Sequence, residues 1–152
     1  MTTGILVVAH HRRMDAEHMA TVRPSGSPRR VAGVMALVAV SLAVASALHL
    51  SGRVDGRSEP FDAQHAGIAE AILCVVLLLG VAVMLLAPAR ARTAGLIAGG
   101  FTTLGFLWGL NLTARGGHWP DISYHLVGLP LLVGCCVVLL RARDDALPPG
   151  RA

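Results

Sequence analysis

The amino-acid sequence predicts an all-α integral membrane protein, in which four transmembrane helices run up, down, up and down and both termini lie in the cytoplasm. Two observations predict this fold. Charged residues make up only 14% of the 152 residues, against about 25% in a soluble domain, and they stand in short blocks between long apolar runs. The arginines are also distributed unequally between the two sides that such helices would define.

Four apolar segments are long enough to cross a bilayer: 31–50, 66–87, 94–113 and 122–140. Helices of about 19–22 residues reach about 30 Å, the thickness of the hydrocarbon core. Short polar loops connect the segments, so neighbouring helices have to be antiparallel. The sequence therefore predicts one transmembrane domain at 31–141, between a polar, disordered cytoplasmic tail at 1–30 and a short cytoplasmic tail at 142–152.

Arginine placement predicts the orientation of the bundle. Cytoplasmic segments of membrane proteins carry an excess of basic residues. Ten arginines belong to the two termini and the loop at 88–93, and three belong to the other two loops, which places both termini in the cytoplasm. The ten are Arg12, Arg13, Arg23, Arg29, Arg30, Arg90, Arg92, Arg141, Arg143 and Arg151; the three are Arg53, Arg57 and Arg115.

The first helix has an alternative interpretation. Arg29 and Arg30, the apolar run after them and the triplet Ala45-Ser46-Ala47 imitate a signal peptide with its cleavage site. The apolar run is longer than the 7–15 residues of a usual signal peptide, so we expect the helix to be retained. Cleavage would leave three helices in the same orientation, and Met14 or Met19 could be the true start.

Five polar side chains are predicted to share the outer half of the membrane: His49, His65, Glu70, Asn111 and His125. A charged residue at the centre of a membrane helix costs about 2.5–3.5 kcal/mol, so we expect Glu70 to face the bundle interior and meet a partner there. His125 is nearest in depth, with Asn111 next and His49 as a further member. A Glu70–His125 pair would either hold two helices together or serve as a ligand or proton site.

The histidines allow a second hypothesis, a haem or metal site. His49, His65 and His125 are the candidate ligands, because facing imidazoles can hold a haem iron and several imidazoles with a carboxylate can hold zinc or copper. Two observations count against it. His49 and His65 fall near the headgroup boundary, and His65 and Glu70 point about 140° apart on one helix. His118 lies on the same side.

Aspartates stand at the predicted starts of two helices. Asp62 and Asp121 precede the second and fourth apolar segments, and aspartate is a preferred N-cap residue. Asp121 and His125 are four residues apart, so they share a helix face and can pair. Trp119 and Tyr124 fit an aromatic belt at the membrane interface.

The third segment contains two G-x-x-x-G spacings, formed by Gly95 with Gly99 and by Gly105 with Gly109. Small residues four apart let helix backbones approach closely in lipid. We expect these glycines to pack against other helices of the same chain. The alternative is that the same surface binds a second copy or another membrane protein.

Several functional classes lack support in the sequence. The arginines form no single stripe, so nucleic-acid binding is not expected. The sequence contains no nucleotide-binding loop and no nucleophile motif, so we expect no enzymatic activity. Cys74, Cys135 and Cys136 lie in apolar segments without a C-x-x-C spacing, so they are predicted to be small hydrophobic residues and not redox or metal ligands.

Two stretches, HAGIAEAIL at 65–73 and TARGGHWPDISYHLVGLPLL at 113–132, resemble those of uncharacterised small four-helix integral membrane proteins of actinobacterial type. The resemblance covers about residues 31–141 and implies a multi-pass protein of the bacterial plasma membrane. The leading hypothesis is a structural or accessory protein with a polar cluster in the outer leaflet. The alternatives are a haem- or metal-binding redox protein and a small proton-coupled transporter that uses Glu70.

Overall fold

The computed structural model describes residues 27–54, 57–116 and 119–142. Most of the predicted tail at 1–30, nearly all of the tail at 142–152 and His118 lie outside these residues. The elements are α2 (Ser27–Leu50), β1 (Arg57–Ser58), β2 (Phe61–Asp62), α3 (Ala63–Leu86), the 3₁₀ turn η1 (Pro88–Arg90), α4 (Ala91–Gly116) and α5 (Trp119–Arg141).

The prediction of an all-α protein with four apolar helices is confirmed. Within the described ranges, four helical spans are long and apolar enough to cross a membrane: Pro28–Leu50, Ala63–Leu86, Pro88–Gly116 and Trp119–Arg141. Many large apolar side chains on them face outward, among them Leu37, Leu79, Leu104 and Val127. Such a surface suits hydrocarbon and not water, so we describe the chain as a multi-pass membrane protein.

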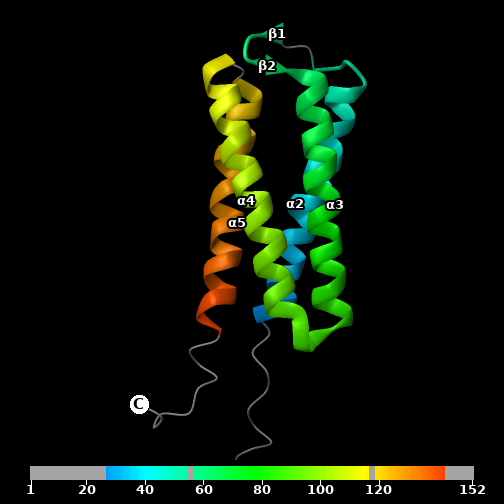
Figure 1. Ribbon diagram of the computed structural model, residues 1–152, viewed down its shortest axis with the longest axis vertical. Helices are drawn as coiled ribbons and strands as arrows, with labels where there is room; N and C mark the ends of the chain where they lie inside the picture. The colour runs from blue at the N-terminus through cyan, green and yellow to red at the C-terminus, as the bar shows by residue number, and fades with distance from the viewer. Residues whose placement is uncertain (1–26, 55–56, 117–118, 143–152) are drawn as a thin grey trace, which may run out of the picture.

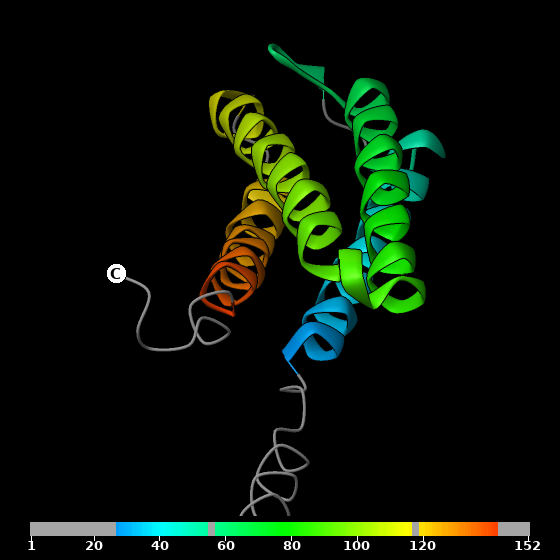
Figure 2. The same cartoon turned by 60° about the horizontal axis from the view of Figure 1, so that its bottom comes forward.

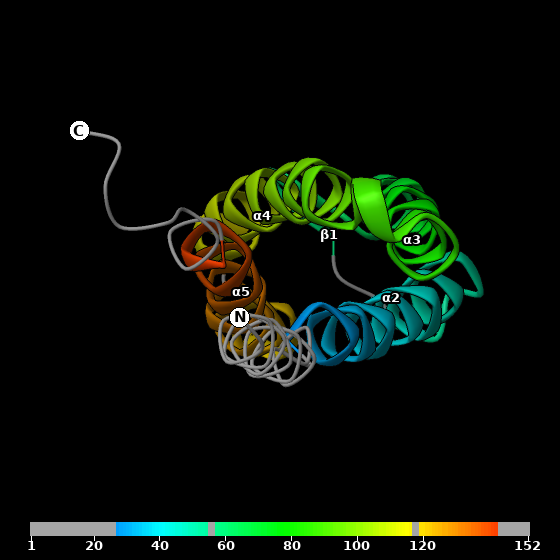
Figure 3. The ribbon, with the colours of Figure 1, turned by 90° about the horizontal axis from the view of Figure 1, so that it is seen from below.

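The helices form an elongated ring. Seen along its axis, α2 lies beside α3, α3 beside α4 and α4 beside α5 (Figure 3). The short β1–β2 hairpin lies at one end of the bundle, here called the hairpin end; η1, the start of α2 and the end of α5 lie at the other (Figure 1). From the start of α3 the hairpin reaches towards α4, which β2 contacts (Figure 2).

Local signals position the helix ends that build the site. Gly52 adopts a φ of +67°, and the backbone N–H of Arg53 then donates to the carbonyl of Leu48 at 3.1 Å, which ends α2 just after His49. Asp62 caps α3, because its side chain accepts from the backbone N–H groups of Gln64 and His65. The predicted capping role of Asp62 is thus confirmed.

The core holds large side chains from all four helices, with Met35, Leu42, Leu77, Phe106 and Leu132 almost completely buried. The close approaches between the helices need glycines. On α4, the four predicted glycines face other helices of the same chain: a Cβ at Gly95 would meet Met84 and Leu139, at Gly99 Cys136, at Gly105 Leu73 and at Gly109 His125. The three cysteines are free thiols.

Candidate functional site

A buried imidazole lies between two carboxylates at the hairpin end. Nδ1 of His49 on α2 is 2.8 Å from Oε2 of Glu70 on α3, and Nε2 of the same ring is 3.4 Å from Oδ2 of Asp121 on α5. The first contact is a hydrogen bond; the second has ion-pair distance without hydrogen-bond geometry. The three residues are only 5–8% exposed. They connect three helices and form the His49–Glu70–Asp121 cluster.

The close packing of α2 on α3 brings His49 to Glu70. The hydroxyl of Ser46 donates to the carbonyl of Gly67 at 2.7 Å, and a Cβ on Gly67 would collide with Leu50. His49 is three residues after Ser46 and Glu70 is three residues after Gly67, so each lies on the same helix face as the residue that makes this contact. Phe61 covers the ring of His49 at the hairpin end, with the two ring centroids 6.0 Å apart.

His125 forms the opposite side of the site. Its Nδ1 lies 2.6 Å from the backbone carbonyl of Asp121. Because a carbonyl only accepts, Nδ1 carries the hydrogen, and in the neutral ring Nε2 is then a hydrogen-bond acceptor. The ring is held edge-on against Phe106 and Tyr124. Its Nε2 lies beside Gly109, where the absence of a side chain leaves room for it.

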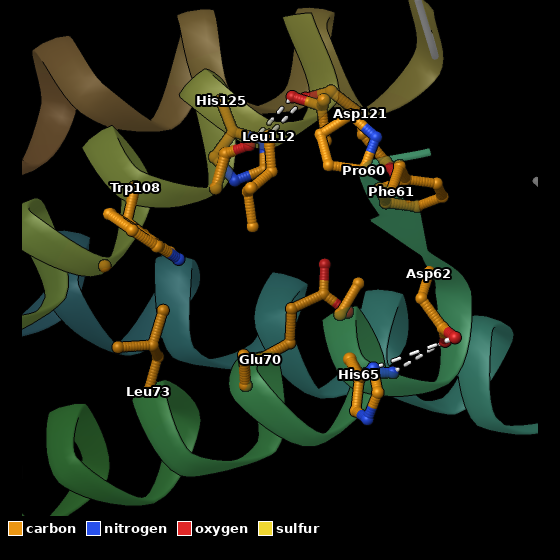
Figure 4. Close-up of a pocket in the computed structure, with 15 residues that line it drawn as sticks. Pro60, Phe61, Asp62, His65, Glu70, Leu73, Trp108, Leu112, Asp121 and His125 are labelled. Carbon is orange, nitrogen blue, oxygen red and sulfur yellow. Dashed lines mark hydrogen bonds and ion pairs between the residues drawn. The ribbon is translucent and has the colours of Figure 1, made fainter. Parts of the chain in front are cut away.

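A cavity of about 280 Å³ lies between Glu70 and His125. Figure 4 shows Glu70 pointing into it from one wall and His125 from the other, with Trp108 on one side and Phe61 on the other. Its wall is formed by α3, α4, the start of α5 and the hairpin: Pro60, Phe61, Asp62, His65, Ala66, Ala69, Glu70, Leu73, Gly105, Trp108, Gly109, Leu112, Thr113, Asp121 and His125. Carboxylate and imidazole groups therefore share a largely apolar pocket.

The predicted pairing of Glu70 with His125 is wrong. Glu70 does meet a buried side chain on another helix, but that partner is His49. Side chains lean towards the N-terminus of their helix, so two residues at different depths on antiparallel helices can meet. At the hairpin end α2 finishes and α3 begins, so His49 leans into the bundle while Glu70 leans towards the hairpin, and the two converge.

Two other predicted site residues lie outside the cluster. Asn111 is exposed on α4 and is not among the cavity residues. The side chain of His65 is 84% exposed, lies 3.7 Å from Asp62, and reaches the rim of the cavity. A polar residue this close to a helix end is accommodated at the membrane interface and has no need of a buried partner.

Sequence reasoning missed the role of Asp121. We expected it to cap a helix that begins at residue 122, but α5 begins at Trp119, so Asp121 belongs to the first helical turn. Its carboxylate faces the interior beside His49, while its carbonyl accepts from His125. The four-residue spacing to His125 was the signal, although the contact uses the backbone of Asp121.

The histidines predicted as haem or metal ligands are engaged separately. His49 binds Glu70, His65 lies beside Asp62, and His125 binds the backbone of Asp121. Across residues 27–54, 57–116 and 119–142, no group of three or more His, Cys, Asp or Glu side chains has an arrangement that could hold a metal ion. The geometry instead offers hydrogen-bond acceptors around a cavity.

Comparisons with known proteins assign no family or function, so the functional proposal is based on the geometry of the site. No protein-family model, curated protein or solved structure matches the chain.

Proposed function

We propose that this chain is a multi-pass protein of the bacterial plasma membrane, with an up-down-up-down topology and both termini in the cytoplasm. The arginine distribution supports this orientation, because ten of the thirteen arginines belong to the termini and the loop around η1. In that orientation the hairpin end, with the cavity and the His49–Glu70–Asp121 cluster, faces outward in the outer half of the membrane.

Within that membrane we propose a non-enzymatic, accessory role in which the cavity binds a small ligand. One observation carries this proposal: buried Glu70 and His125 face each other across a cavity of about 280 Å³. Ligand sites are concave, mostly apolar and furnished with a few convergent polar groups, with volumes of about 300–1,000 Å³. At about 280 Å³ the cavity is just below that range, which suits a small ligand.

A thermal-unfolding screen tests the proposal. The purified protein in nanodiscs is heated with cationic, anionic and neutral compounds, and a ligand at about 100 times its Kd should stabilise it by about 2.7 kcal/mol. Ala66→Phe places a large side chain in the cavity wall, whereas Ala82→Phe makes the same change on α3 outside the cavity. We expect a ligand to raise the Tm of wild type and Ala82→Phe but not that of Ala66→Phe. A compound that raises all three Tm values equally, or no active compound, contradicts a cavity ligand.

A second candidate, a small proton-coupled transporter, is favoured by the position of His49. Its two ring nitrogens face Glu70 and Asp121 at 2.8 and 3.4 Å, and an imidazole between two carboxylates is the kind of group that proton relays in membrane proteins use. The test uses proteoliposomes that contain a pH-sensitive dye. Coupled transport predicts a change in internal pH when a ligand from the screen is added, which Glu70→Gln abolishes. Ligand uptake without proton movement rejects this candidate.

A further inference from the structure

The chemistry of the cavity wall identifies a class of ligand, and this inference rests on the proposed ligand-binding function. The ionisable groups that line the cavity are three carboxylates and the imidazoles of His65 and His125. Glu70 and Asp121 belong to the buried part of the wall and Asp62 to its rim, and no arginine is among the described residues that line it. The chain contains no lysine. In a low-dielectric site, such a wall attracts a positive charge and repels an anion.

His125 adds a requirement for hydrogen bonding. The ring is 8% exposed, its Nδ1 is occupied by the carbonyl of Asp121, and its Nε2 borders the cavity beside Gly109. Within the described part of the chain no group donates a hydrogen bond to this nitrogen. This acceptor is accessible from the cavity, so a ligand with an N–H group can donate to it, whereas a ligand without one gains nothing there.

The remaining walls fit a compact apolar group. Leu73 and Leu112 line the cavity, and Trp108, which is 69% exposed, forms its rim on α4 opposite the exposed Ala69 on α3. The hairpin covers the cavity at its end through Pro60 and Phe61. An aromatic rim attracts both hydrocarbon and cations. Because Trp108 on α4 and Ala69 on α3 are exposed and line the cavity, a ligand can reach the carboxylates laterally, between these two helices.

We propose that the cavity binds a small protonated amine, whose ammonium group donates hydrogen bonds to Glu70 and to Nε2 of His125, with Asp121 supplying further negative charge. The hydrocarbon part of the amine lies against Leu73, Leu112 and Trp108. A primary or secondary ammonium satisfies this arrangement. A quaternary ammonium has the charge but lacks the N–H groups, and a neutral alcohol lacks the charge.

The test is isothermal titration calorimetry on the protein in nanodiscs with four probes that share a phenylethyl group. Phenethylamine is expected to bind, whereas its N,N,N-trimethyl derivative, 2-phenylethanol and 3-phenylpropionate should bind at least about tenfold more weakly, the loss expected for one charge-assisted hydrogen bond. Equal binding of the trimethyl derivative would overturn the N–H requirement, and equal binding of the alcohol would overturn the charge requirement.

Matched variants localise the binding. Glu70→Gln keeps the shape of the side chain and should weaken phenethylamine binding about tenfold or more, while Glu59→Gln changes an exposed acid outside the cavity and should leave it unchanged. Should Glu70→Gln fail to fold, Trp108→Leu at the exposed rim is expected to weaken binding severalfold. Equal losses in Glu59→Gln and Glu70→Gln, or no loss in Trp108→Leu, reject this site. Tighter binding of 3-phenylpropionate, with dependence on Ala66, would reject the amine but keep the cavity as a ligand site.

Discussion

Removing the carboxylate of Glu70 is expected to destabilise the protein by about 1–3 kcal/mol, because Nδ1 of buried His49 loses its hydrogen-bond acceptor. The measurement is the free energy of unfolding of Glu70→Ala in mixed micelles titrated with denaturing detergent. Glu59→Ala removes an exposed carboxylate from the turn before β2, and this control should change the free energy by less than about 0.5 kcal/mol.

A double-mutant cycle measures how much the interaction between Glu70 and His49 itself contributes to the free energy of unfolding. If Glu70 and His49 stabilise each other directly, the combined variant Glu70→Ala/His49→Ala should lose less than the sum of the two single losses, with a coupling energy of about 1–2 kcal/mol. Additive losses would mean that the hydrogen bond contributes nothing to holding α2 on α3, and the cluster would then have to be explained by function alone.

The close contact between α3 and α4 should tolerate no added methyl group at Gly80. A Cβ at this position would overlap the methyl group of Ala98, which has no rotamer to move away, so the two helices would have to separate. Gly80→Ala is expected to cost about 1–3 kcal/mol in the free energy of unfolding, the usual effect of overpacking a core.

Two controls distinguish this collision from a general effect of the substitution. Gly80→Ala/Ala98→Gly moves the methyl group to the opposite helix and should restore most of the lost stability. Gly100→Ala on α4 meets nothing within 4 Å and should be neutral or stabilising by up to about 1 kcal/mol, because alanine is the better helix former. A loss at Gly100 as large as that at Gly80 would show that the collision is not the cause.

The helices could be predicted because the hydrocarbon core imposes their length and composition on the sequence. Each predicted segment lies inside one helix, except for Ala87, the residue after α3. The helices extend further into polar residues, as α5 does when it begins at Trp119. Hydropathy has no signal for those additional turns, since interfacial residues can be either helical or irregular. Asp62 could be placed because an N-cap is a local interaction with the next few residues.

Which residues pair with each other in the site could not be predicted, because the pairing depends on distances between helices that a single sequence does not contain. Glu70 was recognisable as a residue that needs a partner, because the cost of a charge in the membrane follows from composition alone. Its choice of His49 over His125 depends on how close α2 lies to α3 at Gly67, and on the lean of the two side chains. The cavity likewise results from the spacing of α3 and α4 at the hairpin end, which no residue pattern specifies.

Cysteine labelling in intact cells tests most directly whether the cavity that carries Glu70 is open to the outside. In a background with the three native cysteines replaced by alanine, a charged, membrane-impermeant thiol reagent is applied to Ala69→Cys at the cavity rim, Ala82→Cys on the outer surface of α3 away from the cavity, and Ala89→Cys in η1. We predict that Ala69→Cys reacts in intact cells, that Ala89→Cys reacts only after the cells are opened, and that Ala82→Cys stays unreactive in lipid. Labelling of Ala89→Cys but not Ala69→Cys in intact cells would contradict the orientation, and an Ala69→Cys that resists the reagent from both sides would contradict an accessible ligand cavity.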